Sequence, residues 1–484
     1  MWSTKIKLID WVWLFFIATL SFFISGLPFY PFLNSDIAVH VLMTESFSFR
    51  YDLYFWGQDR LGSLVPMVAN IVYRISGISP FWLTALTKWF FLCVGCFSFW
   101  YFIPNRFQRW VWTCLWFFPA YEMMYHLLPG HPYAEQMAMF GLSLVFFKRW
   151  IQSSSSVWDL PLFLLFSILS FWLSDFSLVF YAALFIGFFF SIINQVKLLS
   201  SKPWTSQMFW TFSVLISGIF FILYAKLSAA RDETYTLSMF GSEDQILHSI
   251  SMLWFYTRNV LLFESVSIWN SIYFYATLTS ILFLAVSRKK LRFQASSKVF
   301  FLISIIGFIL IVSLRWLAIN FVMLKYFIPV FFSLWLGILS IDFADIHKRL
   351  RLLLTVVITL IVLGCSGSII YQYNHPSERD IYISDLQSPF FKTQKSIIGD
   401  YWYSYIFAIA NPELIATTPH DLSSVRNWKQ VDRVIESDTI YICLNNWMDE
   451  APQNLIQFDT ELSLINTIEE GQFKFARYRK IGNN

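Results

Sequence analysis

The chain has little charge and little cysteine. Only 14% of its 484 residues are charged, against roughly 25% in soluble domains, which excludes an ordinary globular enzyme, a disordered protein and a nucleic-acid-binding protein. Its five cysteines lie mainly in apolar runs, so we expect no disulfide framework. Cys93 and Cys96 lie in one such run without a second ligand pair, and we interpret them as packing residues.

Apolar and aromatic residues are abundant instead. Hydrophobic residues make up 57% of the chain, which contains 54 Phe, 22 Trp and 23 Tyr. One soluble core could not bury so many large side chains. The composition therefore predicts an all-α polytopic membrane protein with many transmembrane helices.

Eleven stretches are long and apolar enough for a transmembrane helix, which needs about 20 mainly apolar residues. They are residues 11–30, 80–103, 107–125, 133–149, 158–174, 176–196, 206–226, 266–287, 298–316, 325–343 and 351–372. Lys and Arg gather in the loops on the side of the N-terminus, and the short turns on the other side contain neither. By the positive-inside rule, this predicts a cytoplasmic N-terminus and an extracytoplasmic C-terminus.

Two domains are predicted: a transmembrane domain over residues 1–372 and a small extracytoplasmic α/β domain over residues 373–484. Two long outer loops interrupt the first domain, at 31–79 and 227–265, and amphipathic helices are expected within them at 64–76 and 245–263. In the second domain the patterns predict helices at 395–410 and 425–436, strands at 413–418 and 439–444, and a hairpin of 462–468 with 472–479.

Ionisable residues at the predicted outer ends of the spans are the candidate site residues, because such groups are costly near a membrane. Asp36 follows the first span, in the first turn of a helix that Asn34 or Ser35 could cap. The alternative to a role in the site is that Asp36 only caps this helix. Other span ends contribute candidates for binding an acceptor hydroxyl or a divalent ion: His40, Glu122, His131 and Glu135. Their alternatives are water-facing turn residues or partners of a neighbouring side chain.

Several short segments resemble the GT-C superfamily of multi-span glycosyltransferases that use polyprenyl-phosphate sugars. This superfamily includes protein O-mannosyltransferases and the aminoarabinose transferases of lipid A. The segments are Asn34-Ser-Asp-Ile-Ala-Val-His40, Tyr54-Phe-Trp-Gly-Gln-Asp-Arg-Leu-Gly-Ser-Leu64, Lys325-Tyr-Phe-Ile-Pro329 and Gly399-Asp-Tyr-Trp-Tyr-Ser-Tyr405. Ile37 departs from the pattern, because a second acid usually follows the first in these enzymes.

The resemblance implies sugar transfer at the outer face of a bacterial inner membrane, from a polyprenyl-phosphate-linked sugar to a glycan, lipid or protein acceptor. It places Asp36 as the general base that accepts the proton of the acceptor hydroxyl, in a direct displacement that inverts the sugar carbon. Negative charge on the leaving phosphate calls for cations, for which Arg315, Lys325 and Arg231 are the candidates. The sequence identifies no certain cofactor, and whether the site uses a divalent cation stays open.

The alternative function is non-catalytic: a transporter or flippase for lipid-linked glycans, or an assembly partner. A transporter should have polar residues at mid-membrane and internal pseudo-symmetry. The sequence shows no internal repeat, and most of its suspect ionisable groups lie at span ends. The enzyme is therefore the favoured interpretation.

Overall fold

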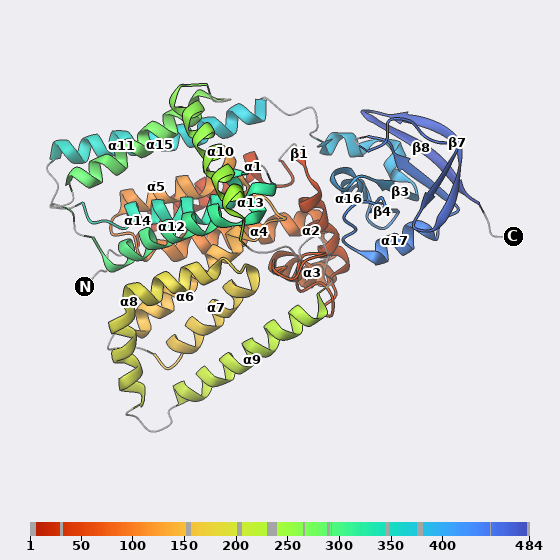
Figure 1. Cartoon of the computed structure of the whole chain (residues 1–484). Helices are drawn as coiled ribbons and strands as arrows, with labels where there is room; N and C mark the ends of the chain where they lie inside the picture. Colours follow the sequence, from red (N-terminus) through yellow and green to blue (C-terminus); the bar gives the residue numbers. More distant parts are fainter. Residues whose placement is uncertain are drawn as a thin grey trace.

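The computed structural model describes residues 6–29, 32–151, 156–200, 206–229, 240–264, 267–287, 291, 293–320, 322–343, 348–374, 381–445 and 447–481. A helical region and a C-terminal domain built on a β-sheet lie side by side (Figure 1). The chain begins at the end of the helical region that is farther from this domain. We call that end the N-terminal end, and the end that contacts the C-terminal domain the domain end.

Each predicted span falls on a helix. These helices are α1 (Leu8–Ser25), α4 (Pro80–Trp100), α5 (Arg106–Phe117), α6 (Tyr133–Trp150), α7 (Asp159–Leu173), α8 (Ser177–Ser200), α9 (Ser206–Ser228), α11 (Ile268–Ser287), α12 (Ala295–Ser313), α14 (Ile328–Leu339) and α15 (Lys348–Asn374). Among the described residues, five helices are long and apolar enough to cross a membrane, namely α1, α4, α9, α11 and α12. The count of eleven spans therefore stays a prediction.

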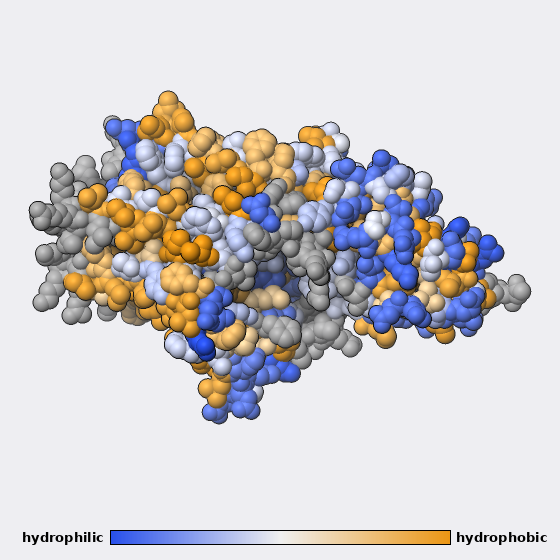
Figure 2. All heavy atoms as spheres, turned by 90° about the horizontal axis from the view of Figure 1, so that it is seen from above, coloured by the Kyte–Doolittle hydropathy of each residue, from blue (hydrophilic) through white to orange (hydrophobic). Residues whose placement is uncertain are grey.

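The molecular surface divides in the same way as the fold. Hydrophobic residues cover much of the helical region, whereas hydrophilic residues cover most of the C-terminal domain in the view of Figure 2. Apolar surface on this scale marks contact with lipid. The chain is therefore a membrane protein with a hydrophilic domain at one end.

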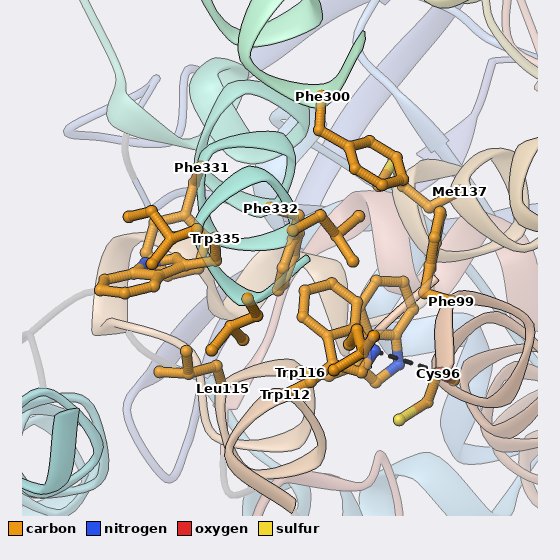
Figure 3. Close-up of a cluster of buried hydrophobic side chains, with 14 of the residues drawn as sticks. Cys96, Phe99, Trp112, Leu115, Trp116, Met137, Phe300, Phe331, Phe332 and Trp335 are labelled. Atoms are coloured by element: carbon orange, nitrogen blue, oxygen red, sulfur yellow. Dashed lines mark hydrogen bonds between the residues drawn. The ribbon is translucent and has the colours of Figure 1, made fainter. Parts of the chain in front are cut away.

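Tryptophans of α5 form the centre of the helical core (Figure 3). The rings of Trp112 and Trp116 lie 5.1 Å apart, and Trp116 also packs against Phe332 of α14 at 4.9 Å. Both indole N–H groups are satisfied by carbonyls of α4: Trp112 donates to Cys96 at 3.2 Å and Trp116 to Leu92 at 2.9 Å. These two bulky side chains thereby join neighbouring helices while their own N–H groups are paired.

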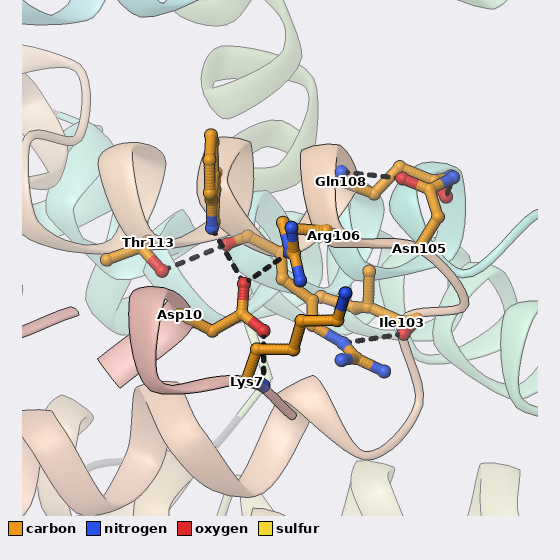
Figure 4. Close-up of polar contacts among 9 residues, drawn as sticks. Lys7, Asp10, Ile103, Asn105, Arg106, Gln108 and Thr113 are labelled. Atoms are coloured by element: carbon orange, nitrogen blue, oxygen red, sulfur yellow. Dashed lines mark hydrogen bonds and ion pairs between the residues drawn. The ribbon is translucent and has the colours of Figure 1, made fainter. Parts of the chain in front are cut away.

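A polar cluster anchors the N-terminal end (Figure 4). Asp10 of α1 is only 1% exposed. Its carboxylate pairs with Arg106 at 2.9 Å and accepts hydrogen bonds from Trp110 at 3.1 Å and from the Lys7 backbone at 2.8 Å. These contacts hold the start of α1 against the start of α5.

Shorter helices build the domain end. They are α2 (Ser35–Ser46), α3 (Leu64–Ser76), α10 (Glu243–Leu261), α13 (Arg315–Ile319) and the 3-10 helices η1 (Tyr121–His126) and η4 (Leu324–Phe327). The amphipathic helices expected at 64–76 and 245–263 are α3 and α10. The expected cap of α2 is also confirmed, because Asn34 Oδ1 accepts a hydrogen bond of 2.9 Å from the Ile37 backbone.

The C-terminal domain contains a six-stranded mixed sheet in the order β4-β3-β5-β8-β7-β6. Its strands are β3 (Lys395–Gly399), β4 (Ile415–Pro419), β5 (Thr439–Cys443), β6 (Asn454–Gln457), β7 (Thr460–Glu470) and β8 (Phe473–Lys480). The helices α16 (Tyr401–Ala410) and α17 (Trp428–Ile435) accompany the sheet. Strand β3 runs parallel to β4 and β5, and the other pairs are antiparallel.

One prediction in this domain is wrong. The helix expected over 395–410 is a strand followed by a helix, since β3 occupies Lys395–Gly399 and α16 starts only at Tyr401. A short apolar run such as Ile397-Ile398 has no periodicity that separates a buried strand from a buried helix. Asp400 marks the true boundary by capping α16, with its Oδ1 accepting from the Tyr403 backbone at 2.9 Å.

The C-terminal domain is attached to the segment that follows α1. Strand β1 (Phe32–Leu33) pairs antiparallel with β2 (Ile381–Tyr382), which lies at the start of the domain. Immediately beyond β1, α2 packs against α16. Residues far apart in the sequence thus meet at the first turn of α2, which carries Asp36.

Candidate functional site

The first turn of α2 is packed against the tight turn between η1 and α6. Gly130 in this turn has φ +95°, and its N–H donates a hydrogen bond of 2.9 Å to His40 Nδ1. A Cβ on Gly130 would lie 2.7 Å from the backbone carbonyl carbon of Asp36. Only glycine therefore allows this approach, which brings His131 beside Asp36.

Asp36 is held by the C-terminal domain and is still partly exposed. Its Oδ1 accepts a hydrogen bond of 2.8 Å from the Tyr401 hydroxyl. Ser35 donates to the backbone carbonyl of the same tyrosine. The other carboxylate oxygen, Oδ2, lies 3.7 Å from His131 Nε2, and 21% of the Asp36 side chain is exposed. One carboxylate oxygen is therefore held by a hydrogen bond, while the other accepts none among the described residues.

The neighbouring imidazole is neutral. Burial lowers the pKa of His131 well below its ordinary value, and the positive charges of Lys325 and Lys88 lower it further. A distance of 3.7 Å is also too long for a hydrogen bond. His131 Nε2 is buried and has no hydrogen-bond partner among the described residues. Asp36 and His131 are therefore close neighbours that form neither a hydrogen bond nor an ion pair.

One of the expected phosphate-binding cations lies near these two side chains. Lys325 interacts electrostatically with Asp36 and His131. Its ammonium group sits 4.8 Å from the ring centroid of Tyr125. A cation over an aromatic face is attracted by the electrons of the ring. The site thus combines a carboxylate and a cation from elements that are remote in sequence.

The loop with the Gly-Gln motif, residues 54–64, contacts the same end of the helical region. Tyr54 and Gly62 form an isolated bridge, and Leu61 pairs with Ser174. From this loop the Arg60 guanidinium lies 5.3 Å from the ring of Trp316, whose indole donates to the Tyr326 hydroxyl at 2.9 Å. The loop therefore reaches the segment that carries Lys325.

The sequence analysis missed a further cation, Arg426, in the C-terminal domain. Its guanidinium lies 5.1 Å from the ring centroid of Tyr401, and the residue is 7% exposed. Gly57 makes room for it, because a Cβ at that position would lie 2.8 Å from Arg426 Cδ. No local motif marks Arg426. The glycine in Trp56-Gly-Gln58 is the signal in the sequence that the environment of Arg426 is crowded.

Glu135, by contrast, is engaged by a lysine. Lys88 of α4 contacts both Glu135 carboxylate oxygens, at 3.1 and 3.0 Å, and donates to the His131 backbone carbonyl at 2.9 Å. Both side chains of the pair are buried. His40 is engaged as well, through Gly130, and burial lowers its pKa to about 3. Glu135 and His40 thus hold the turn that presents His131.

Among the remaining candidates, the structure describes the side chain of Arg315. Arg315 is half-buried at the start of α13, where its Cα would lie 3.5 Å from a Cβ placed on Gly241. Arg231 and the Glu122 side chain lie outside the described residues. Within the described ranges, no group of three His, Cys, Asp or Glu side chains is placed to hold a metal ion.

The fold and this site define a helical membrane protein with an aromatic-lined carboxylate at the end that carries a β-sheet domain. No family model and no curated protein matches the chain. It is similar to a solved structure of the archaeal oligosaccharyltransferase AglB from Archaeoglobus fulgidus, in complex with an inhibitory peptide and a dolichol-phosphate. The similarity covers 90% of this chain and 70% of that chain, with 10% sequence identity and a TM-score of 0.42.

AglB is a glycosyltransferase of the GT-C superfamily, which the sequence motifs of this chain resemble. At so low a TM-score we base the function of this chain on the residues of its site and not on the match.

Proposed function

We propose that this protein is a glycosyltransferase that moves a sugar from a polyprenyl-phosphate donor to an acceptor hydroxyl. The observation that carries the proposal is the state of Asp36. This carboxylate is held through one oxygen by Tyr401, its side chain is partly exposed, and the ammonium of Lys325 lies close by. A base with a cation nearby is what displacement of a lipid phosphate by a hydroxyl requires.

In the proposed reaction, Asp36 Oδ2 accepts the proton of the acceptor hydroxyl. The hydroxyl oxygen forms a bond to the anomeric carbon of the sugar, and the bond from that carbon to the phosphate oxygen breaks. The electron pair leaves with the polyprenyl phosphate, whose added negative charge Lys325 stabilises. Attack from the side opposite the phosphate inverts the anomeric carbon, so no second carboxylate is needed as a nucleophile.

The other proposed roles follow from this assignment. Arg315 and Arg231 are further candidates for the donor phosphate, for which a guanidinium offers two parallel hydrogen bonds. His131 lies beside Asp36 and is the candidate for an acceptor hydroxyl. We propose that Glu135 and His40 act on the acceptor only through the turn that they hold.

The proposed location is a bacterial inner membrane, with the N-terminus cytoplasmic and the C-terminal domain outside. A reporter fused after Asn484 tests this orientation, and activity of the reporter only in the cytoplasm would overturn it. Labelling of Cys443 is unsuitable for the purpose, because this thiol is buried.

Mass spectrometry of surface glycans tests the function. Cells that lack the protein should lose one sugar residue from a glycan, lipid or protein, and the parental gene should restore it. The gene for the Asp36→Asn variant should not restore the sugar. Asn keeps the shape of the side chain and the cap of the helix but cannot accept a proton, which should lower the rate of sugar transfer by ~10²–10⁴-fold.

Asp52→Asn is the matched control. Asp52 lies in the same predicted loop, where its carboxylate accepts hydrogen bonds from Trp56 and the Ser48 backbone. This variant should restore the sugar. Equal amounts of both variants must be present in the membrane, and near-normal transfer by Asp36→Asn would return Asp36 to a capping role.

A further inference from the structure

A second polar site lies in a pocket at the N-terminal end, away from Asp36. The pocket has a volume of about 470 Å³, within the range of ~300–1,000 Å³ that small-molecule sites occupy. Helices α6, α8 and α12, with the segments after α4 and α14, provide its lining. Most of the lining is apolar, including Phe102, Leu144, Phe147, Leu184, Phe188 and Phe300.

Contacts around the pocket place it at this end. Gln108 at the start of α5 donates to the Ile341 carbonyl, beside Asp342 of the lining, at 2.8 Å. Arg106 of the same helix start pairs with Asp10 at the start of α1. Helix α1 has 18 residues and therefore spans about 27 Å at 1.5 Å per residue. The pocket and Asp36 are thus separated by about the length of a membrane-crossing helix.

The cation of the pocket has no carboxylate partner. Lys148 lines it, and its ammonium lies 4.4 Å from the ring centroid of Tyr101. No ion pair of Lys148 occurs in the part of the chain that the structure describes, although the adjacent Arg149 pairs with Asp159 at 3.0 Å. A half-buried cation without a counter-ion is costly, and an anionic ligand would compensate it.

Further donors belong to residues that line the same pocket. Gln294 lines it, and its Nε2 is buried without a hydrogen-bond partner among the described residues. Ala295 and Ser296, the first residues of α12, line it too. The first backbone N–H groups of a helix have no partner within the helix and carry partial positive charge. An amide, an ammonium and a helix N-terminus therefore offer donors to one anion.

We propose that this pocket binds a membrane phospholipid, with its phosphate at Lys148, Gln294 and the start of α12. One acyl chain would lie along the apolar side chains of α6 and α8. The apolar lining favours a lipid phosphate over a free anion, because only the lipid carries a chain that buries this surface. Asp342, the acidic residue of the lining, already takes part in an interaction of its own.

Native mass spectrometry of the full-length protein in detergent tests the proposal, with dioleoyl-phosphatidylglycerol as the probe. Binding of one lipid should be saturable. Dioleoylglycerol has the same chains without the phosphate and should bind about tenfold more weakly, the loss expected for a charge-assisted hydrogen bond. Inorganic phosphate should not displace the lipid. Equal binding of dioleoylglycerol, or displacement by inorganic phosphate, would overturn the proposal.

Two variants locate the binding. Lys148→Gln should weaken phosphatidylglycerol binding about tenfold. Ala295→Glu should weaken it as well, although an acidic residue at an exposed helix start favours folding. The matched control is Lys298→Gln, which removes the same charge from an exposed position on α12 outside the lining. If all three variants bind like the parent protein, the lipid is not in this pocket. Because the pocket is remote from Asp36, sugar transfer and lipid binding can fail independently.

Discussion

The carboxylates at the two ends of the helical region are held in different ways. At the N-terminal end, Asp10 and Asp159 are 1% and 2% exposed. Each pairs with an arginine and also accepts a backbone hydrogen bond. At the domain end, Asp36 accepts a hydrogen bond from Tyr401 and faces a neutral imidazole across 3.7 Å.

The difference separates structural carboxylates from one that can react. A carboxylate whose oxygens are all paired stabilises the fold and has no position left for a substrate. Glu135 belongs to the structural group although it lies near Asp36, because Lys88 occupies both of its oxygens. Whether a carboxylate takes part in the reaction is therefore better judged from the number of its hydrogen-bond and ion-pair partners than from its proximity to the site or its burial in the membrane.

The largest expected effect comes from breaking the structural pair. Glu135→Gln leaves the Lys88 ammonium buried without a counter-ion, which should cost about 3–5 kcal/mol of folding free energy. Thermal unfolding in detergent measures this. Replacing both partners, Lys88→Met with Glu135→Leu, should recover most of the loss because no charge stays buried. A Glu135→Gln protein that is as stable as the parent but inactive would instead place Glu135 in the reaction.

A smaller loss is expected from the cations of the proposed donor site. Lys325→Ala should reduce sugar transfer about 10²-fold, since it removes a charge aimed at the leaving phosphate. Lys325→Arg should be tolerated, and Arg315→Lys should keep part of the activity that Arg315→Ala loses. Glycan mass spectrometry with quantified protein measures each. Parental rates for both alanine variants would exclude these two residues as phosphate ligands.

The hydroxyl of Tyr401 should have a moderate effect. Tyr401→Phe removes a hydrogen bond worth about 0.5–1.5 kcal/mol, which predicts a roughly 2- to 10-fold loss in the rate of transfer with unchanged stability. Trp402→Phe, at the exposed neighbouring position, is the control and should transfer at the parental rate. An unchanged rate in Tyr401→Phe would mean that Asp36 is positioned by its own helix alone.

The last prediction concerns the dependence of stability on pH. Burial lowers the pKa of His40 to about 3, whereas the unfolded chain has a value of ~6.5. Between these values the unfolded state binds more protons, so stability falls as the pH falls below ~6.5, by up to ~1.4 kcal/mol per unit. His40→Asn keeps an acceptor for Gly130 and should make the slope shallower in unfolding measured from roughly pH 4 to 7. An unaltered slope would show that His40 titrates normally.

Local patterns in the sequence were sufficient for most of the fold. Each of the eleven stretches that hydropathy marked falls on a helix, and α3 occupies Leu64–Ser76 as predicted. The hairpin of β7 and β8 was predicted as well, because alternation and a turn glycine are signals within a few residues. Strand β3 was missed, because its neighbours β4 and β5 determine its structure and lie elsewhere in the chain.

The sequence by itself determined that this is a membrane protein, where the helices of its eleven apolar stretches lie and which acidic residue lies in the first turn of α2. Those properties depend on composition and on spacing within one element. Only the tertiary structure decided the state of each charge. Asp36 meets Tyr401 across 365 residues, and Lys88 meets Glu135 across 47. Whether a carboxylate is saturated or available depends on such distant partners, which no local pattern encodes.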